Sequence, residues 1–295
     1  MRHALVTSSR VSVTHANTYQ GALAWGFPGP TTWVGMMTAL NLRLKERGSP
    51  IQVQSVAVVV YDFQPQVAQG KFCPPRAPLD ERGQVQGIQE AQGGWANLEA
   101  AFVFKVAYEG DLDLVITELM TELFFLRFAG GAMLSKRGKP SYLCLTGDRD
   151  KDHEEFMAYK RRWMLGSLLK LRTELIQEHQ ACLSQELGTA ASKLEAWYDL
   201  FTIRVRDDSE TMTRAYGGWL VPVTTGYQGV SPVYPPGTVQ GVRDQGVPFH
   251  FVESIWDVGE WVSPSRLEST DAVFCRPEYD PVTGTYRCLM ETCHV

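Results

Sequence analysis

A stretch that cannot form core separates the two strand-like segments that most strongly suggest a buried sheet. Residues 64–94 contain four prolines, several glycines and few large aliphatic side chains. The flanking segments, Val53–Phe63 and Leu98–Tyr108, are apolar and typical of buried strands. The core must therefore contain segments that precede and follow a long excursion of the chain. We expect the two arms of this excursion to pair as a ribbon around a turn at Asp80–Gly83.

Further elements alternate with these strands. The other predicted elements of the first half are strands at Leu5–Val13 and Ser141–Leu145 and helices at Thr32–Arg47 and Leu112–Phe128. The order β-α-β, excursion, β-α-β predicts the α+β class, with a ferredoxin-like core and an inserted hairpin.

The second half divides into a helical middle and a β-rich end. Asp150–Leu187 has the pattern of one long helix, which Gly166 weakens, and Leu194–Ile203 predicts another helix. Beyond Gly217, frequent glycine and proline with short apolar runs predict strands and ordered loops.

Composition excludes several classes of protein. The 295 residues are 44% hydrophobic, which excludes a disordered chain, and no long uncharged apolar run predicts a membrane span. No secretory signal is evident, so we expect a cytoplasmic protein whose six cysteines stay reduced. Cys288, Cys293 and His294 do not have the spacing of a zinc site, so we predict no metal and no cofactor.

Charge is segregated along the chain, although the net charge of −5 argues against a uniformly basic binder. Residues 1–50 carry five Lys or Arg and one acid, and residues 123–147 carry four cations and no acid. Residues 244–295 are strongly acidic. Such a chain could hold a short RNA locally or dock its acidic face on a basic partner, unless the segregation arose by chance.

Two motifs combine aromatic residues with glycine and proline. The first is Trp-Gly-Phe-Pro-Gly-Pro-Thr-Thr-Trp at Trp25–Trp33, and the second runs from Gly217 to Leu267 and closes with Gly-Glu-Trp-Val-Ser-Pro-Ser-Arg-Leu. Exposed aromatic rings can stack on nucleobases, and glycines let a polynucleotide backbone approach closely. Packing in the core is the alternative for these rings.

With these motifs in this order, the chain resembles the type I-F branch of the "Cas five" family, the second subunits of the CRISPR surveillance (Csy) complex. The resemblance runs from about Leu5 to Arg287. It implies a single RNA-recognition-motif-like domain over residues 1–295, a thumb hairpin inserted at 64–97 and a β-rich elaboration at 204–295. It also implies that Leu165–Thr173 is a strand rather than part of a helix.

The same resemblance implies a function. Members are non-catalytic RNA-binding subunits that hold the 5′ handle of the guide RNA (crRNA), pair with the large subunit and contact the terminal backbone subunit. The complex recognises double-stranded target DNA in antiviral defence, and target DNA is a further expected contact of the complex. No membrane contact is expected.

The candidate site residues follow from the motifs and the charged segments. The predicted RNA-binding residues are Arg10, Asn17, Trp25, Phe27, Lys71, Arg76, Arg82, Gly130, Gly131, Arg243 and Arg266. Lys160, Arg161 and Arg162 form a basic cluster that is a candidate for contact with RNA or target DNA.

Most of these candidates have a structural alternative. The alternatives are core packing for Phe27 and Trp25, a helix C-cap for Gly130-Gly131, a solvated face for the cationic cluster and the excursion, and ion pairs within the fold for Arg243 and Arg266. Two other functions stay open: a repeat-specific endoribonuclease using His15, Tyr19 or Lys71, and a scaffold without direct RNA contact.

Overall fold

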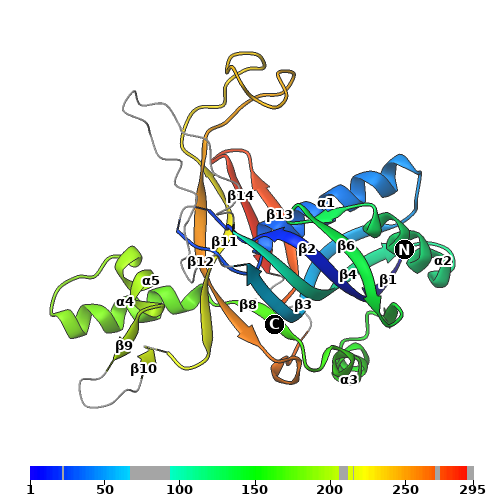
Figure 1. Ribbon diagram of the computed structural model, residues 1–295, viewed down its shortest axis with the longest axis horizontal. Helices are drawn as coiled ribbons and strands as arrows, with labels where there is room; N and C mark the ends of the chain where they lie inside the picture. The colour runs from blue at the N-terminus through cyan, green and yellow to red at the C-terminus, as the bar shows by residue number, and fades with distance from the viewer. Residues whose placement is uncertain (22, 67–93, 206–211, 215, 270–272, 291–295) are drawn as a thin grey trace.

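The computed structural model describes the chain except for residues 22, 67–93, 206–211, 215, 270–272 and 291–295 (Figure 1). The described helices are α1 (Pro30–Glu46), α2 (Leu112–Phe124), α3 (Arg149–Tyr159), α4 (Glu174–Leu187) and α5 (Lys193–Leu200), with short 3-10 helices η2 (Lys160–Trp163) and η3 (Pro264–Arg266). The strands of the first half are β1 (Arg2–Thr7), β2 (Arg10–Asn17), β3 (Gln52–Gln66), β4 (Trp95–Tyr108), β5 (Arg127–Phe128), β6 (Gly131–Arg137) and β7 (Ser141–Leu145). Those of the second half are β8 (Ser167–Leu171), β9 (Ile203–Val205), β10 (Met212–Arg214), β11 (Trp219–Gly229), β12 (Val252–Val262), β13 (Cys275–Asp280) and β14 (Thr285–Met290).

A large antiparallel sheet organises the molecule, which confirms the mixed helix and strand composition expected from the sequence. Its path runs β13-β14-β11-β12-β8-β3-β4-β2-β6-β5 through the described strands, and β1 lies between β4 and β7. The central strands β3 and β4 pair from Gln52 opposite Ala107 to Gln66 opposite Trp95, with register shifts between Val53 and Ser55 and between Val60 and Asp62. The two strands predicted on either side of the proline-rich excursion therefore form one long ladder. Residues 64–66 of the predicted excursion belong to β3, and residues 67–93, with the turn of the predicted ribbon, lie outside the described residues.

The N-terminal segment forms two strands where one was predicted. β1 pairs with the second half of β4, and β2 pairs with the first half of the same strand. At the break between them, Phe102 N donates to Ser8 Oγ at 2.9 Å and Ser8 N donates to Phe102 O at 2.8 Å. Ser8 thus keeps the N-terminal segment hydrogen-bonded to β4 at the break. On the other side of this segment, the pairing strand changes from β7 for β1 to β6 for β2.

Helices α1 and α2 cover one face of the sheet, where the largest hydrophobic core lies. Pro30 begins α1, as the missing N–H of proline allows, and the Asp111 side chain caps α2 by accepting from Asp113 N at 2.8 Å. Glu122 of α2 is fully buried and binds Arg43 Nε of α1 at 2.8 Å. This ion pair ties the two helices together over the sheet.

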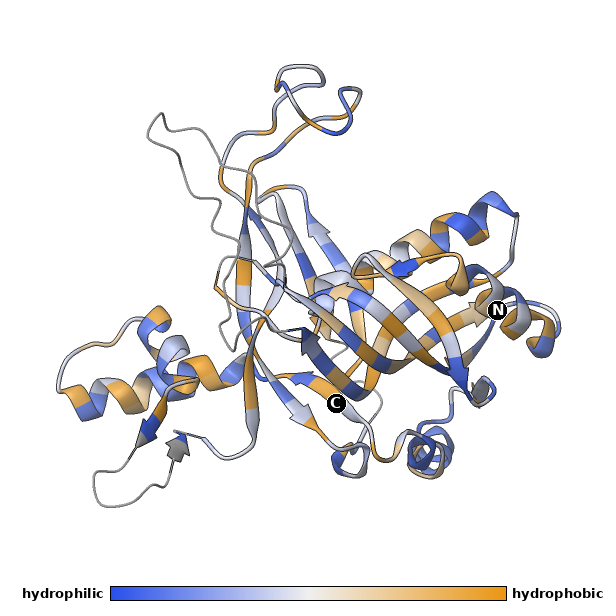
Figure 2. Ribbon diagram, viewed as in Figure 1, coloured by the Kyte–Doolittle hydropathy of each residue, from blue (hydrophilic) through white to orange (hydrophobic). Residues whose placement is uncertain are grey.

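The opposite face of the central strands is also covered. Phe156 and Tyr159 from α3 and Trp163 from η2 pack with Leu5 and Val103 in a second core. In Figure 2 the rest of α3 is mostly hydrophilic, in keeping with a helix that buries only one narrow edge. Sheet-face stacking of bases, as in RNA-recognition motifs, is therefore blocked by protein side chains here.

One predicted helix ends earlier than the sequence pattern indicates. The helix beginning at Leu112 ends at Phe124, and Arg127–Phe128 turns back as β5 instead of extending the helix. Ala129 and Gly130 have φ angles of 50° and 77°, so they form the two-residue turn of a hairpin with β6. Gly130 therefore lies in a hairpin turn and Gly131 begins β6, so the alternative of a helix C-cap is wrong.

The middle of the chain is not one helix. Residues 149–163 form α3 and η2, β8 follows at Ser167–Leu171, and α4 begins at Glu174, as the family resemblance implied. β8 joins β3 to β12 within the sheet. α4 and α5 form a lobe at the far end of β11 and β12, beside the β9–β10 pair (Figure 1).

Candidate nucleic-acid interface

A basic pocket opens where the first strand is broken. At Ser8 and Ser9 the outer neighbour changes from β7 to β6, and the gap between these outer strands leaves a pocket of about 300 Å³. The residues that line it are Thr7, Ser8, Ser9, Arg10, Tyr61, Ala101, Arg137, Gly138, Lys139, Ser141 and Arg162. They come from both ends of the break, from β3, from the β6–β7 connection and from η2.

The charge of this pocket has one sign. Arg10, Arg137, Lys139 and Arg162 line it, and no Asp or Glu is among its described lining residues. Arg10 and Arg137 also lie directly opposite each other in the β2–β6 ladder. Like charges in this position repel each other, and a bound anion would relieve the repulsion. The arrangement therefore suits a phosphate group.

Tyr61 forms an aromatic wall of the pocket. The guanidinium of Arg10 lies over its ring, with Cζ 3.6 Å from the ring centre. Burial raises the pKa of the Tyr61 phenol above its usual value of 10.0, although Arg10 opposes the shift. Tyr61 is therefore neutral near pH 7 and leaves the positive charge of Arg10 intact.

Hydroxyl groups hold one side of the pocket in place. Tyr159 Oη lies 2.8 Å from Thr7 Oγ1 and 3.1 Å from Ser141 Oγ, and Trp163 Nε1 donates to Thr7 Oγ1 at 3.1 Å. This network joins β1, β7, α3 and η2 beneath the cations. Because Tyr159 and Trp163 are buried, the wall is preorganised before any ligand binds.

Asn17 and the glycine pair meet at the other end of β2. Asn17 N donates to Ala129 O at 2.8 Å, and the Asn17 side chain accepts from Tyr19 N at 3.0 Å. A side chain at Gly131 would place its Cβ 2.6 Å from Thr14 O, so glycine is required by the close approach of β6 to β2. The predicted residues Asn17, Gly130 and Gly131 are thus brought together.

The two aromatics of the first motif have different places. Trp25 is 37% exposed and forms an isolated bridge with Tyr19. Phe27 is buried, with its ring centre 5.5 Å from that of Trp261 and 6.0 Å from that of Phe63. The core alternative holds for Phe27, whose ring cannot stack on a base without leaving this cluster.

The three residues of the basic cluster after α3 differ in burial and in their contacts. Lys160 is buried, and its Nζ donates to the carbonyl oxygens of Ser265 and Leu267. Arg161 and Arg162 are exposed, and Arg162 lines the basic pocket. The ammonium group of Lys160 therefore binds the segment that follows β12, and Lys160 does not line the basic pocket.

The remaining cationic candidates lie elsewhere. Arg243 is exposed in the connection between β11 and β12, which projects away from the sheet at the top of Figure 1, and Arg266 is exposed at the end of η3. Neither lines the basic pocket. Lys71, Arg76 and Arg82 lie outside the described residues.

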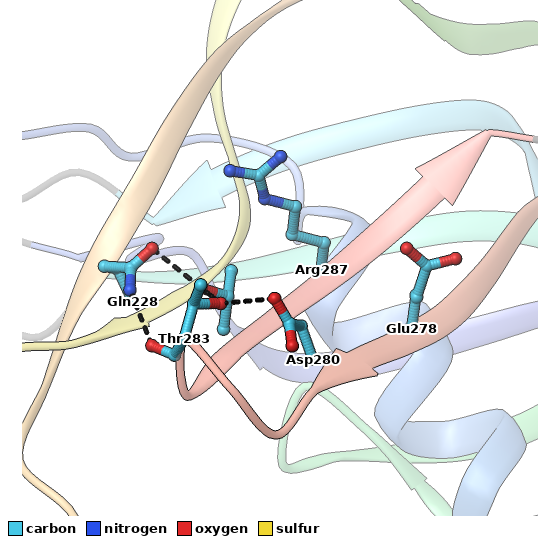
Figure 3. A pocket seen from close by; sticks show the side chains of 6 residues that line it. Gln228, Glu278, Asp280, Thr283 and Arg287 are labelled. Carbon is cyan, nitrogen blue, oxygen red and sulfur yellow. Dashed lines mark hydrogen bonds between the residues drawn. The ribbon is translucent and has the colours of Figure 1, made fainter.

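A second pocket lies between β11 and the β13–β14 hairpin (Figure 3). Thr283 Oγ1 donates to Asp280 Oδ2 at 2.7 Å, and Gln228 Nε2 donates to Thr283 O at 3.0 Å. Glu278 and Asp280 give this pocket more acid than base, since Arg287 is its one described cation. Its hydrogen bonds are made within the protein, and its charge does not suit a phosphate.

Sequence reasoning missed part of the basic pocket. Arg137 and Lys139 were noted as cations in an acid-free segment but not as site residues, and Tyr61 was assigned only to a strand. The signal that could have pointed to a break in this strand is the run of polar residues Thr7-Ser8-Ser9-Arg10 inside it. Among the described residues no cluster of metal-ligating side chains occurs, and no helix there is long and apolar enough to cross a membrane.

Comparison with known proteins agrees with the resemblance drawn from the motifs. The family model described as CRISPR-associated protein (Cas_Csy2) matches residues 6–288. The CRISPR-associated protein Csy2 of Pseudomonas aeruginosa (strain UCBPP-PA14) is 30% identical over 312 residues, covering 96% of this chain and 94% of that protein. The match spans every element that builds the basic pocket, and the chain belongs to the Csy2 family of CRISPR-associated proteins.

Proposed function

We propose that this protein is a non-catalytic subunit of a cytoplasmic type I-F Csy surveillance complex and holds the 5′ handle of the guide RNA. Within that complex it pairs with the large subunit and contacts the terminal backbone subunit. It thereby supports RNA-guided recognition of double-stranded DNA in antiviral defence. Family membership supports the assignment to the complex.

The basic pocket is the observation that carries RNA binding. Four cations converge on it without a carboxylate among the described lining residues, and two of them oppose each other across a ladder. A phosphodiester backbone supplies the anions that such a group of cations attracts. The guanidinium group of arginine can also donate two parallel hydrogen bonds to phosphate oxygens, which orients the RNA strand as well as attracting it.

The RNA path proposed from this pocket follows β2. Arg10 begins the strand and Asn17 ends it, next to Gly131 and near the exposed ring of Trp25. A handle laid along this strand has phosphate contacts at one end and an aromatic surface at the other. This route begins on the α3 side of the sheet, beside the second core, because Ala101 and Tyr61 contribute both to that core and to the pocket.

The proposed domain organisation is a ferredoxin-like core with two additions. The strand order β7-β1-β4-β3, with every neighbour antiparallel and α1 and α2 on one face, supports the core. In this proposal residues 64–97 form the thumb hairpin and residues 204–295 the β-rich elaboration, within a single domain of residues 1–295.

The proposal is tested by recovering the RNA that the complex contains. The tagged chain is co-expressed with its neighbouring subunits and a CRISPR array, and the co-purified RNA is sequenced with both ends mapped. We expect guides with one uniform repeat-derived 5′ handle. The triple variant Arg10→Gln, Arg137→Gln, Arg162→Gln should lose them. Guides cut at new positions that depend on His15 would establish an endoribonuclease, and RNA retained fully by the triple variant would contradict the pocket.

A salt titration measures how many phosphate contacts the triple variant loses. For the purified chain and a handle RNA, the slope of log affinity against log salt should fall by about 2 in the triple variant, because each lost phosphate contact on a single strand contributes about 0.7. The matched control replaces the exposed cations Lys45, Lys193 and Arg276 with Gln, and the slope should not change.

A further inference from the structure

A surface leucine occupies a backbone position that disfavours it. Gly166 N donates to Trp163 O at 3.0 Å, which closes a tight turn whose central residues are Met164 and Leu165. Met164 has φ −56° and ψ 150°, and Leu165 has φ 68°. These angles are those of a type II turn, in which the second central position favours glycine or asparagine.

Packing within the chain does not explain this leucine. Its side chain is 91% exposed, and that of Met164 is 43% exposed. A large apolar residue here is strained by its backbone and gains little from burial in the isolated protein. Strain of this kind, when it is retained at an exposed position, points to a role for the side chain outside the fold.

The turn is held firmly from both sides. Trp163 before it is fully buried and donates from Nε1 to Thr7 Oγ1 at 3.1 Å. Gly166 after it packs so tightly that a Cβ there would lie 2.4 Å from Val59 Cγ1 and 3.0 Å from Tyr61 Cε1. Leu165 is therefore presented at a fixed position rather than on a loose loop.

The turn also borders the basic pocket. Tyr61, which Gly166 approaches, is the aromatic wall of that pocket, and Arg162 of η2 lines it three residues before Leu165. Arg161 is exposed on the same short helix. An apolar tip thus lies beside cations that suit phosphate groups. A nucleic acid strand offers the matching combination, because apolar base faces alternate with anionic phosphates along it.

We propose that Leu165, supported by Met164, inserts between two neighbouring bases of the guide RNA whose phosphates occupy the basic pocket, and so unstacks that base step. This inference rests on the proposed RNA-binding function. Aliphatic wedges of this type separate stacked bases when the flanking phosphates are held. Holding one step open would leave the bases on either side splayed for contact along β2.

The test uses the complex reconstituted from this chain, its neighbouring subunits and guide RNAs that carry 2-aminopurine at each handle position in turn. The fluorescence of this base rises when it is unstacked. At one step we expect the signal to fall by about twofold or more in Leu165→Gly and to be retained in Leu165→Met, which keeps an apolar wedge. Leu165→Gly should also raise the Tm of the isolated chain by roughly 2–4 °C, since glycine relieves the strained turn.

The control is Leu114→Ala, which removes an exposed leucine from the regular helix α2 and should change neither the signal nor the assembly. If guide RNA is retained but no position responds to Leu165, the wedge is wrong and the proposed function stands. If Leu165→Gly instead releases a neighbouring subunit, the leucine contacts protein and the wedge is overturned. If the wild-type complex holds no RNA, the proposed function itself fails.

Discussion

The guanidinium of Arg10 lies over the ring of Tyr61, with 3.6 Å between Cζ and the ring centre, and both residues line the basic pocket. The ring holds the guanidinium in one orientation. Tyr61→Leu should therefore weaken the binding of handle RNA by about 3–10-fold, the value of one cation–π contact. Tyr61→Phe keeps the ring and should bind like the wild type. Fluorescence anisotropy with labelled RNA measures both, and equal affinities for all three proteins would show that the stack has no part in binding.

Lys160 should matter for stability and not for RNA. Its removal in Lys160→Met leaves the carbonyl oxygens of Ser265 and Leu267 without their donor, at a cost of about 1–3 kcal/mol in the free energy of unfolding. Urea unfolding measures this loss, and the salt slope of RNA binding should be unchanged. Arg161→Gln, at the exposed neighbouring position, is the matched control and should leave the unfolding free energy within error. A reduced salt slope in Lys160→Met would return this lysine to the RNA interface.

Gly131 and Gly130 should respond differently to substitution. In Gly131→Ala the new Cβ meets Thr14 O at 2.6 Å and Val13 Cγ1 at 2.8 Å, so overpacking should cost about 1–3 kcal/mol of stability. Gly130 has φ 77° and nothing near its Cβ position, so Gly130→Asn should be tolerated in the hairpin turn. Thermal unfolding of both variants checks the pair, and equal losses would contradict the close approach of β6 to β2.

Asp257 should make stability decrease as pH rises. Burial raises the pKa of this carboxyl above its usual 3.8, although hydrogen bonds from Thr173 Oγ1 and Val258 N oppose the shift. The native state therefore binds the proton more tightly than the unfolded state, and this contribution is lost as pH rises from about 4 through the raised pKa. The Tm of Asp257→Asn, relative to wild type, should increase over that range.

Asp152 provides a control of opposite sign. Burial raises the pKa of this carboxyl, but hydrogen bonds from Thr146 and Gly147 outweigh burial and hold it below 3.8. Its stabilisation is present above that pH and is lost as pH falls through the lowered pKa. Asp152→Asn should therefore become less stable relative to wild type as pH rises. Parallel curves for the two variants would contradict both assignments.

Sequence patterns predicted the strands whose side chains are apolar on both faces. Val53–Phe63 and Leu98–Tyr108 became the central ladder because their apolar side chains face cores on both sides of the sheet. The helix from Leu112 was extended too far because Phe128 continues its apolar pattern. In the structure that residue is buried from a strand, after a turn whose positive φ angles the pattern does not show.

The site was harder to predict than the fold. Arg10 lines the basic pocket, and Asn17 and Gly131 meet at the other end of β2, while their contact with RNA stays a prediction. Lys160 was grouped with its exposed neighbours because its partners, two backbone carbonyls, are more than a hundred residues away and carry no sequence signal. Tyr61 was missed for the same reason, since only pairing across the sheet brings it beneath Arg10.

The ladder between β3 and β4 continues to Gln66 and Trp95, where the two strands are still paired. The sheet therefore holds the two ends of the joining segment next to each other. Doubling the number of residues between these two anchors would cost only about 0.6 kcal/mol in loop closure. A change in the number of residues between these anchors should consequently cost the sheet little stability.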